Sequence, residues 1–328
     1  MGLLYEGEWR PGRGAVPKDG RFRRGPTRYR NWVTRDGAAG PSGEGGFPAA
    51  SGRYHLYVSF ACPWAHRTLI FRALHGLQGH VSVDVVHPLM GDDGWTFATD
   101  VAGATGDRVS GKDLLREVYL AADPRASGRV TVPVLWDKQR AIIVSNESSE
   151  IIRMFNSAFD AITGNADDYW PAPLRNAIEA VNTRVYDGLN NGVYRAGFAA
   201  TQEAYDEAVT EVFATLDWLE DKLARARYLV GGRLTEADWR LATTLFRFDP
   251  VYHGHFKCNR RRLVDYPNLW AYARELYQHP GVAGTVRFDH ITRHYYSSHA
   301  SINPTRIVPI GPDLDWSAPH DRGRRSAA

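Results

Sequence analysis

The sequence predicts an α/β domain followed by an all-helical domain. Before position 160, short runs of β-branched and aromatic residues alternate with stretches whose apolar residues lie on one helical face. From Leu174 onward, apolar residues recur only at helical spacing. A chain of 328 residues, 43% hydrophobic and 23% charged, is long enough for two globular domains.

The first domain is expected to begin with a strand at Tyr54 and to place a helix directly after Cys62, with apolar residues at positions 69, 70, 71 and 74. The elements that follow are a strand over 81–87, a helix over 112–122 inside a long insertion, strands over 130–136 and 141–144, and a helix over 147–155. The two strands after the insertion are close enough for a hairpin. This order of elements predicts a thioredoxin-like fold with a right-handed crossover between the first two strands.

The second domain is expected to contain several amphipathic helices. One apolar stripe comprises Ile178, Val181, Val185 and Leu189, and another comprises Tyr205, Val209, Val212, Phe213, Leu216, Leu219 and Leu223. Thr235 and Asp238 form a capping box at a helix start. Further helices are predicted over 241–248, 267–278 and 282–295.

The domain boundaries predicted from these patterns are 1–50 for an irregular extension, 51–160 for the α/β domain, 171–300 for the helical domain and 301–328 for a tail. The extension is rich in Gly, Pro and Arg and has no periodicity. It resembles a basic nucleic-acid tail, but its interleaved aromatic and acidic residues favour a segment packed over the body. The end of the Pro-rich tail is predicted to be disordered.

The chemistry is expected at Cys62. Because Pro63 suits the first helical position, Cys62 is placed at a helix N-terminus, where backbone N–H groups and the helix dipole favour an anion. Such an environment acidifies a thiol toward the reactive thiolate. The alternative is an inert buried cysteine, which is common for free Cys.

Cys62 has no second cysteine beside it. Ala65 stands where a dithiol redox motif has its second Cys, and Cys258 is distant in sequence. A monothiol catalyst needs its resolving thiol from solution, and glutathione is the abundant small thiol of the cell.

Several other functions are disfavoured. The sequence has no run of about 18 apolar residues and no signal-peptide pattern, so no membrane segment is expected. Two cysteines cannot make a disulfide framework, which favours a reducing cytoplasm, and a net charge of +3 is too small to indicate a nucleic-acid partner. No glycine-rich nucleotide motif follows a strand. The closely spaced residues His253, His255, Cys258, His290 and His294 do not make a full ligand set, so no metal is expected.

The assembly of motifs resembles a known family. A thioredoxin-like domain with Thr-Val-Pro-Val at 131–134, followed by a helical domain with a capping box, is similar to the cytosolic glutathione transferases. Pro133 matches the cis-proline that stands beside the catalytic Cys in the thioredoxin superfamily. Five motifs resemble the glutathionyl-hydroquinone reductases, the Xi class: Cys-Pro-Trp-Ala-His-Arg at 62–67, Gly-Asp-Asp-Gly-Trp at 91–95, Ser-Asn-Glu-Ser-Ser-Glu-Ile at 145–151, Gly-His-Phe-Lys-Cys-Asn at 254–259, and His-Tyr-Tyr-x-Ser-His-x-x-Ile-Asn-Pro-Thr at 294–305.

The resemblance implies a glutathione site in the first domain. Glu147 would take the ammonium of the γ-glutamyl end, and Ser148 with its helix N-terminus would take the carboxylate. A helix cap is the alternative role for this pair. Val132 matches the residue whose backbone pairs with the cysteinyl part, while Trp95 and Arg129 match residues that close over glutathione and contact its glycyl end.

The resemblance also implies an aromatic pocket for the hydroquinone, formed by Tyr194, Tyr252 and Tyr295, although such tyrosines are also common in protein cores. Tyr194 and Tyr295 would act with Cys62 in catalysis, because phenol hydroxyls donate protons to a departing ring. The implied reaction reduces glutathionyl-hydroquinones through a Cys62–glutathione mixed disulfide, and the implied assembly is a homodimer. The alternatives are a conjugating glutathione transferase and a non-catalytic binding module on the same fold.

Overall fold

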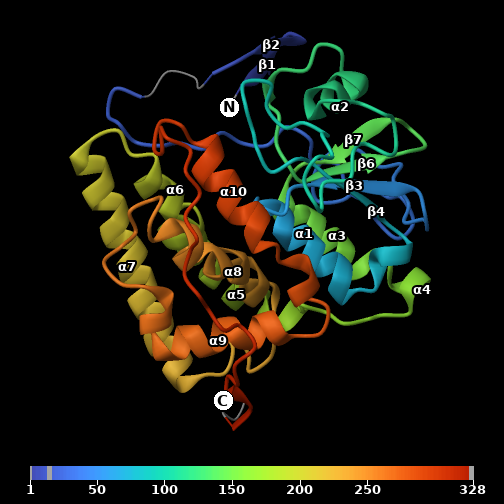
Figure 1. Cartoon of the computed structure of the whole chain (residues 1–328). Coiled ribbons are helices and arrows are strands. Elements are labelled where there is room, and N and C mark those ends of the chain that lie inside the picture. Colours follow the sequence, from blue (N-terminus) through green and yellow to red (C-terminus); the bar gives the residue numbers. More distant parts are fainter. Residues whose placement is uncertain (1, 13–16, 325–328) are drawn as a thin grey trace. The chain divides into compact units, whose positions relative to one another are not determined.

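The structure is a computed structural model of the chain and describes residues 2–12 and 17–324. It divides into two compact units (Figure 1). The first comprises Met1–Gly14 and Gly25–Asp167, and the second comprises Ala15–Arg24 and Asp168–Ala328. The first is an α/β unit and the second is helical, so the predicted fold class is confirmed.

A mixed four-stranded sheet with the order β4-β3-β6-β7 forms the centre of the first unit. Its strands are β3 (Tyr54–Val58), β4 (Ser82–Val85), β6 (Val134–Asp137) and β7 (Ile142–Ser145). β3 runs parallel to β4 and antiparallel to β6, and β6 and β7 form the predicted antiparallel pair. Every residue of β3 is buried, which agrees with its tyrosine, leucine and valine residues, and the one polar residue, His55, lies 2.8 Å from the Ser82 hydroxyl through its Nδ1.

The helices of the first unit follow the expected order. They are α1 (Pro63–Leu74), α2 (Leu115–Ala122), α3 (Ser148–Ser157), α4 (Asp160–Thr163) and the short turn η1 (Leu77–Gly79). α1 and α3 lie side by side in Figure 1 and contact one another along their length. Both helices bury apolar residues beside the sheet, including Ile70 and Phe71 from α1 and Ile151 and Phe155 from α3.

The strand predicted over 130–136 is wrong in its first half. β6 begins only after Pro133, whose ring nitrogen has no hydrogen to donate to a neighbouring strand. The peptide bond before Pro133 is cis, as predicted. Upstream, Gly128–Arg129 forms the separate short strand β5.

The expectation of a wholly irregular extension is also wrong in part. β1 (Leu3–Tyr5) pairs with β2 (Glu8–Arg10) and with β5, and these strands make a small antiparallel sheet. The strands have only two or three residues each, too few to show a period of two. One of the two partners of β1, the strand β5, is more than a hundred positions away in the sequence, so no local pattern predicts that pairing.

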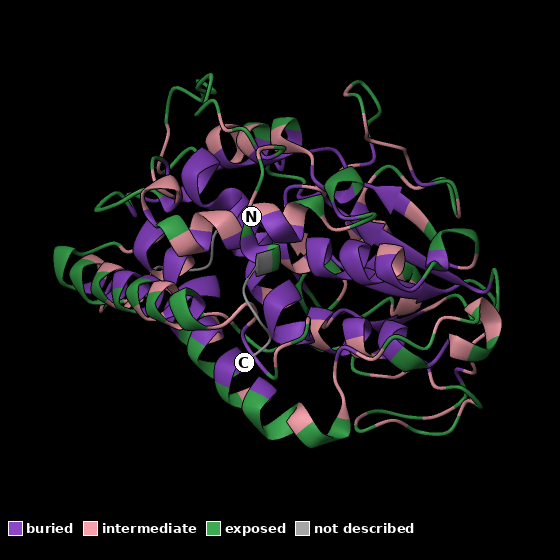
Figure 2. Cartoon of the chain, turned by 90° about the horizontal axis from the view of Figure 1, so that it is seen from below, coloured by how far each residue is buried: buried purple, intermediate pink, exposed green. Residues whose placement is uncertain are grey.

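The second unit is built from helices. The longer ones are α5 (Arg175–Val185), α6 (Gly192–Gly197), α7 (Gln202–Arg225), α8 (Glu236–Arg247), α9 (Pro267–Gln278) and α10 (Phe288–Ser298). Shorter helical segments are η2 (Ala172–Leu174), η3 (Tyr186–Asn190), η4 (Phe248–Tyr252), η5 (Leu263–Asp265), η6 (Ala283–Thr285) and η7 (Arg322–Arg324). The helix predicted over 282–295 is divided into η6 and α10, and the one predicted over 241–248 starts earlier, at Glu236. Figure 2 shows that some helices carry both buried and exposed residues, as α7 does, whereas α8 is buried at every position except Arg240.

The predicted capping box at the start of α8 is confirmed. The carboxylate of Asp238 accepts hydrogen bonds from the Thr235 amide at 2.8 Å and hydroxyl at 3.0 Å. It also accepts from the Leu229 amide and from the Tyr272 hydroxyl, at 3.0 and 2.6 Å. One buried carboxylate therefore joins α8, α9 and the turn before α8.

The tail is anchored to the helical unit at two buried residues near its end. Trp316 is buried against the rings of Phe246, Trp270 and Phe288. Arg322 is 1% exposed and donates to Glu275 at 3.0 Å. The disorder predicted for the end of the tail concerns residues that include 325–328, which lie outside the described residues.

Candidate active site

Cys62 lies where β3 gives way to α1. It is the N-cap of α1, with extended backbone angles, and Pro63 is the first residue of the helix. The Cys62 amide donates to the carbonyl of Ser59 at 3.2 Å, and the Cys62 carbonyl accepts the first helical bond from His66 at 3.0 Å. Cys62 is partly exposed. The thiol therefore stands at the positive end of the helix dipole and within reach of solvent.

The segment before β6 contains Val132, another predicted site residue, and places it beside Cys62. The Cys62 Sγ lies 3.5 Å from the carbonyl oxygen of Val132, close enough for a thiol hydrogen bond. The cis bond between Val132 and Pro133 follows directly. The Val132 carbonyl therefore lies next to the Cys62 sulfur. It belongs to an irregular segment whose backbone is able to pair with an extended peptide.

Glu147 and Ser148 stand at the N-terminus of α3. Glu147 is the N-cap, and its Oε1 accepts from the Ser149 amide at 3.0 Å and from the Ser149 hydroxyl at 2.7 Å. Ser148 is the first helical residue and is 4% exposed. The capping role weighed for Glu147 in the sequence is thus present in the structure, and it leaves the carboxylate fixed at a site that favours anions.

Two residues that the sequence did not indicate act on the Glu147 carboxylate. The Thr27 hydroxyl donates to Glu147 Oε2 at 3.0 Å. Burial acts to raise the pKa of Glu147, but the bonds from Ser149 and Thr27 and the charge of Arg67 together hold that pKa below its usual value. Arg67 is the last residue of the Cys-Pro-Trp-Ala-His-Arg motif at 62–67. In the sequence, the only sign that it could act at the site was its position on the same helix, five residues after Cys62.

Trp95 and Arg129 are differently exposed. Trp95 is 6% exposed, and its carbonyl accepts a hydrogen bond from the Leu115 amide at 3.0 Å. Arg129 is an exposed residue of β5, where it pairs with Leu3 of β1. Their predicted contacts with glutathione remain predictions.

In the second unit, the structure brings the three predicted tyrosines together. The Tyr295 hydroxyl, from α10, lies 2.5 Å from that of Tyr194, from α6, and 3.1 Å from that of Tyr252, from η4. Tyr252 and Tyr295 are 0% and 1% exposed, whereas Tyr194 is partly exposed. Tyr295 is therefore the centre of a hydroxyl chain whose accessible end is Tyr194.

The environment keeps the inner hydroxyls protonated. Burial raises the pKa of Tyr252 and Tyr295 well above 10, and the proximity of Tyr194 acts in the same direction. The charge of the buried Arg247, at the end of α8, opposes this rise at both tyrosines. At neutral pH, both groups are consequently able to donate a proton.

The second unit also contains the remaining cysteine and a pair of histidines in contact with one another. Cys258 is completely buried, and burial raises the pKa of its thiol to about 12. His255 Nε2 lies 3.1 Å from His299 Nδ1, and burial lowers the pKa of His255 to about 4. Among residues 2–12 and 17–324, no group of three or more His, Cys, Asp or Glu side chains is arranged to hold a metal.

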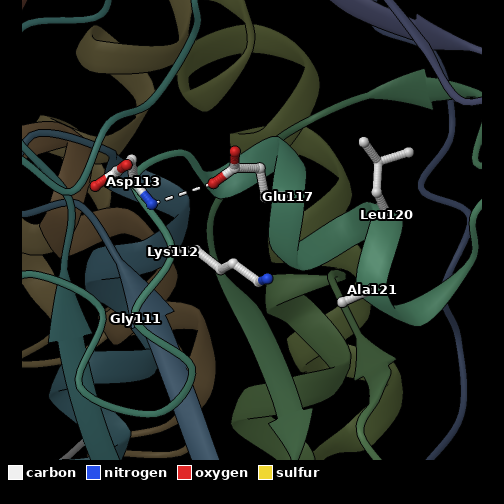
Figure 3. Close-up of a pocket in the computed structure, with 6 residues that line it drawn as sticks. All are labelled: Gly111, Lys112, Asp113, Glu117, Leu120 and Ala121. Carbon is white, nitrogen blue, oxygen red and sulfur yellow. Dashed lines mark hydrogen bonds between the residues drawn. The ribbon is translucent and has the colours of Figure 1, made fainter.

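A separate surface pocket lies beside α2 (Figure 3). It is lined by Gly111, Lys112, Asp113, Glu117, Leu120 and Ala121, and none of the predicted site residues contributes to it. Within this group, Glu117 accepts a hydrogen bond from the Asp113 amide at 3.1 Å, which ties the loop to the helix.

No helix in the described part of the chain is long and apolar enough to cross a membrane.

Comparison with known proteins agrees with the two-unit architecture. Residues 61–158 match the family described as glutathione S-transferase, N-terminal domain, and residues 202–275 match the family described as glutathione S-transferase, C-terminal domain. The glutathionyl-hydroquinone reductase YqjG of Escherichia coli (strain K12) is 56% identical over 99% of both chains. The glutathionyl-hydroquinone reductase PcpF of Sphingobium chlorophenolicum is 53% identical over 95% of this chain and 96% of its own.

Solved structures extend this similarity to the fold. The glutathione-bound structure of YqjG superimposes with a TM-score of 0.93 over 99% of this chain and 100% of that chain. The Xi class glutathione transferase of Natrialba magadii is 49% identical and superimposes with a TM-score of 0.91, over 99% of this chain and 98% of its own. With both parts of the fold and nearly the full length of the chain matched, the protein belongs to the glutathione S-transferase family, and within that family to the Xi class of the glutathionyl-hydroquinone reductases.

Proposed function

We propose that this protein reduces glutathionyl-hydroquinones to hydroquinones, with glutathione as the second thiol and Cys62 as the nucleophile. The observation that carries the proposal is the partly exposed Cys62 at the N-terminus of α1, 3.5 Å from the Val132 carbonyl. The names of YqjG and PcpF, at 56% and 53% identity, support the same reaction. A conjugating transferase needs only to activate glutathione, whereas a nucleophilic Cys is suited to taking the glutathionyl group itself.

The first step is thiol exchange at the glutathionyl sulfur. The Cys62 thiolate forms a bond to that sulfur as the bond from sulfur to the ring breaks, and the ring leaves with the electron pair. The ring gains a proton and becomes the hydroquinone, while Cys62 is oxidised to a mixed disulfide with glutathione. In the second step, the thiolate of another glutathione attacks this disulfide, which releases oxidised glutathione and regenerates the Cys62 thiolate.

The first unit supplies the groups that would hold glutathione. In this assignment, Glu147 binds the γ-glutamyl ammonium, and Ser148 with the N-terminus of α3 binds the adjacent carboxylate. The Val132 backbone pairs with the cysteinyl part, so that its sulfur is presented to Cys62. Trp95 covers the tripeptide, and Arg129 neutralises the glycyl carboxylate.

The tyrosine chain supplies the proton for the departing ring. Tyr194 is the partly exposed member and would meet a ring oxygen directly. Tyr295 would replenish its proton, because their hydroxyls are 2.5 Å apart, and Tyr252 fixes the orientation of Tyr295 from behind at 3.1 Å. Tyr194 and Tyr295 are therefore assigned as catalytic residues, and Tyr252 as the residue that completes the ring-binding wall.

The chain lacks a second thiol near Cys62, so the mixed disulfide should accumulate when glutathione is withheld. Protein given glutathionyl-hydroquinone alone should release one hydroquinone per Cys62 and then stop, and added glutathione should restart turnover. Intact-protein mass spectrometry measures the adduct. Cys62→Ala should give neither burst nor adduct, whereas Cys258→Ser should give both. Absence of an adduct on the wild type during the burst, or its presence on Cys258, contradicts the mechanism.

The depressed pKa of Glu147 predicts how glutathione binding depends on pH. The carboxylate stays charged as the pH falls from 7 through its ordinary value of 4.5, so affinity should be constant over that range and be lost only below it. Thr27→Val removes a bond that lowers this pKa, so the loss should begin at higher pH. Calorimetric titration with unreactive S-methylglutathione measures both curves.

The matched control for that titration is Thr34→Val, at a partly exposed threonine whose hydroxyl donates to the Ala38 carbonyl instead. Its curve should coincide with that of the wild type. Glu147→Gln should weaken binding about tenfold or more at pH 7, the scale of a lost charged hydrogen bond. If Glu147→Gln binds as tightly as the wild type, Glu147 does not hold the ammonium.

The hydroxyl chain predicts an order among tyrosine variants. Tyr194→Phe and Tyr295→Phe should each lower kcat by ~10²-fold, the usual scale for a lost proton donor, and Tyr252→Phe should lower it less. Affinity for S-methylglutathione should be unchanged in all three. Tyr205→Phe is the control, because that hydroxyl donates to the Lys257 carbonyl outside the chain of tyrosines. Full turnover in the triple Phe variant would show that release of the ring does not require these hydroxyls.

We also propose that the protein is a cytoplasmic homodimer. Glutathione is abundant in the cytoplasm, Cys62 and Cys258 are not in a disulfide, and symmetric dimers are the commonest assemblies. Ile307, Val308 and Ile310 are exposed apolar residues of the tail that a partner would cover. Sedimentation equilibrium at micromolar concentration should return the mass of two chains, and a single-chain mass would refute the dimer.

A further inference from the structure

The helix α2 lies in the insertion between β4 and β5, and none of the residues assigned above to glutathione or to the ring belongs to it. Its N-terminus is held at two points. The Glu117 carboxylate accepts from the Asp113 amide at 3.1 Å (Figure 3), and the Leu115 amide donates to the Trp95 carbonyl at 3.0 Å. Leu115 and Val118 are buried, and α2 contacts β7. One face of α2 is therefore packed into the first unit.

Tyr119 lies on this buried face and makes three hydrogen bonds through its hydroxyl. The hydroxyl donates to the Thr131 carbonyl at 2.8 Å, and it accepts from the Thr131 amide at 3.3 Å and from Asn146 Nδ2 at 3.2 Å. A phenol hydroxyl offers one hydrogen and two lone pairs, so these bonds use its full capacity. Thr131 lies shortly before β6 and Asn146 shortly before α3. One hydroxyl thus joins two segments that β6 and β7 separate in the sequence.

Both residues that Tyr119 contacts directly precede an assigned glutathione-binding residue. Thr131 precedes Val132, whose carbonyl lies beside the sulfur of the proposed nucleophile. Asn146 precedes Glu147, the N-cap of α3. In the proposed assignment, Val132 pairs with the cysteinyl part of glutathione and Glu147 binds its γ-glutamyl ammonium. The Tyr119 hydroxyl therefore connects the groups that hold two consecutive parts of the tripeptide.

The Asn146 side chain is held from a second direction by the N-terminal extension. Its Oδ1 accepts from the Tyr29 amide at 3.2 Å, and the Asn146 amide donates to the Tyr29 carbonyl at 3.2 Å. The rings of Tyr29 and Tyr119 meet edge to face, with centroids 5.7 Å apart. Thr27, two residues before Tyr29, donates to the Glu147 carboxylate. The same network thus also holds the stretch that supplies Thr27.

The Tyr119 hydroxyl keeps its proton near neutral pH. Burial raises the pKa of Tyr119 above its ordinary value of 10, and the hydrogen bonds with Thr131 and Asn146 act in the opposite direction. The bond that the hydroxyl donates to the Thr131 carbonyl is therefore present under the conditions in which glutathione would bind.

We propose that Tyr119 is a positioning residue of the glutathione site, which holds the Val132 backbone and the Glu147 carboxylate at the separation that one glutathione molecule requires. The inference rests on the proposed reductase function, because it takes Val132 and Glu147 as glutathione-binding groups. Tyr119 acts through these neighbours and is assigned no contact with glutathione. Two groups that are fixed before the ligand arrives bind it more tightly, because no free energy is spent on ordering them.

The test measures the dissociation constant of S-methylglutathione by calorimetric titration of the full-length protein. Tyr119→Phe keeps the ring and removes the hydroxyl, and it should raise the dissociation constant about tenfold, the scale of one or two lost neutral hydrogen bonds. Tyr54→Phe is the matched control, because Tyr54 is also buried in the first unit and its hydroxyl donates to the Pro48 carbonyl at 2.8 Å. That bond holds neither Val132 nor Glu147, so the control should bind as the wild type does.

A double-mutant cycle with Glu147→Gln separates positioning from a general loss of structure. If Tyr119 positions the Glu147 carboxylate, Tyr119→Phe should raise the dissociation constant much less in the Glu147→Gln background than in the wild type. Asn146→Ala provides a second cycle, because it breaks the link to α3 and leaves the bonds between Tyr119 and Thr131 intact. It should show the same coupling to Glu147→Gln. Circular dichroism checks that each variant is folded.

Three results overturn the proposal: an unchanged dissociation constant in Tyr119→Phe, an equal rise in Tyr54→Phe, or effects of Tyr119→Phe and Glu147→Gln that simply multiply in the double variant. Release of hydroquinone from a glutathionyl-hydroquinone is followed separately in the wild type. If the wild type binds S-methylglutathione but releases no hydroquinone, the reductase function fails, and the cycle still decides whether Tyr119 positions the site. A wild type that does not bind S-methylglutathione contradicts both.

Discussion

The arrangement of the first unit depends on the turn between β3 and α1. β3 is buried between β4 and β6 and must end at Val58, while α1 must begin at Pro63 to pack beside α3. Ser59 joins the two: its carbonyl accepts from the Cys62 amide at 3.2 Å, and its hydroxyl accepts from the Ala61 amide at 3.2 Å. The last residue before the helix is thereby held at the helix N-terminus. The side chain of a cysteine at this position points in a fixed direction, and the positive end of the helix dipole stabilises its thiolate.

The N-terminus of α3 is capped in a different way from that of α1. α3 is capped by Glu147, a charged side chain, and the hydrogen bonds of Thr27 and Ser149 offset the cost of its partial burial. A neutral cap would satisfy the same amide but would carry no charge for a cationic group. The structure therefore combines an anion-favouring helix end with a carboxylate whose pKa is held below its ordinary value, which suits a ligand that carries an ammonium and a carboxylate on one carbon.

Local signals were sufficient to predict the helices that follow Cys62 and Glu147, but they did not predict α6 and η4, which carry Tyr194 and Tyr252. Pro63 after Cys62 predicted the start of α1, the Thr235 and Asp238 spacing predicted the cap of α8, and Pro133 was recognised as a cis-proline. The residues that were missed act over long sequence distances. Thr27 bonds to Glu147 from a stretch that has no periodicity, and Tyr119 bonds to Asn146. The pairing of β1 with β5 is equally non-local. Only tertiary packing places such residues, so a pattern read along the chain does not find them.

The burial of Cys258 has a practical meaning for the chemistry of the whole chain. Its thiol has no exposed surface and a pKa of about 12, so in the native protein it is neither ionised at neutral pH nor open to reagents. Cys62 is the other cysteine and is partly exposed. An alkylating reagent should therefore modify one thiol per chain in the native protein and two in the unfolded protein. The number of thiols that react per chain should therefore rise from one toward two as the protein unfolds, and of the two cysteines only Cys62 is open to oxidants in the native protein.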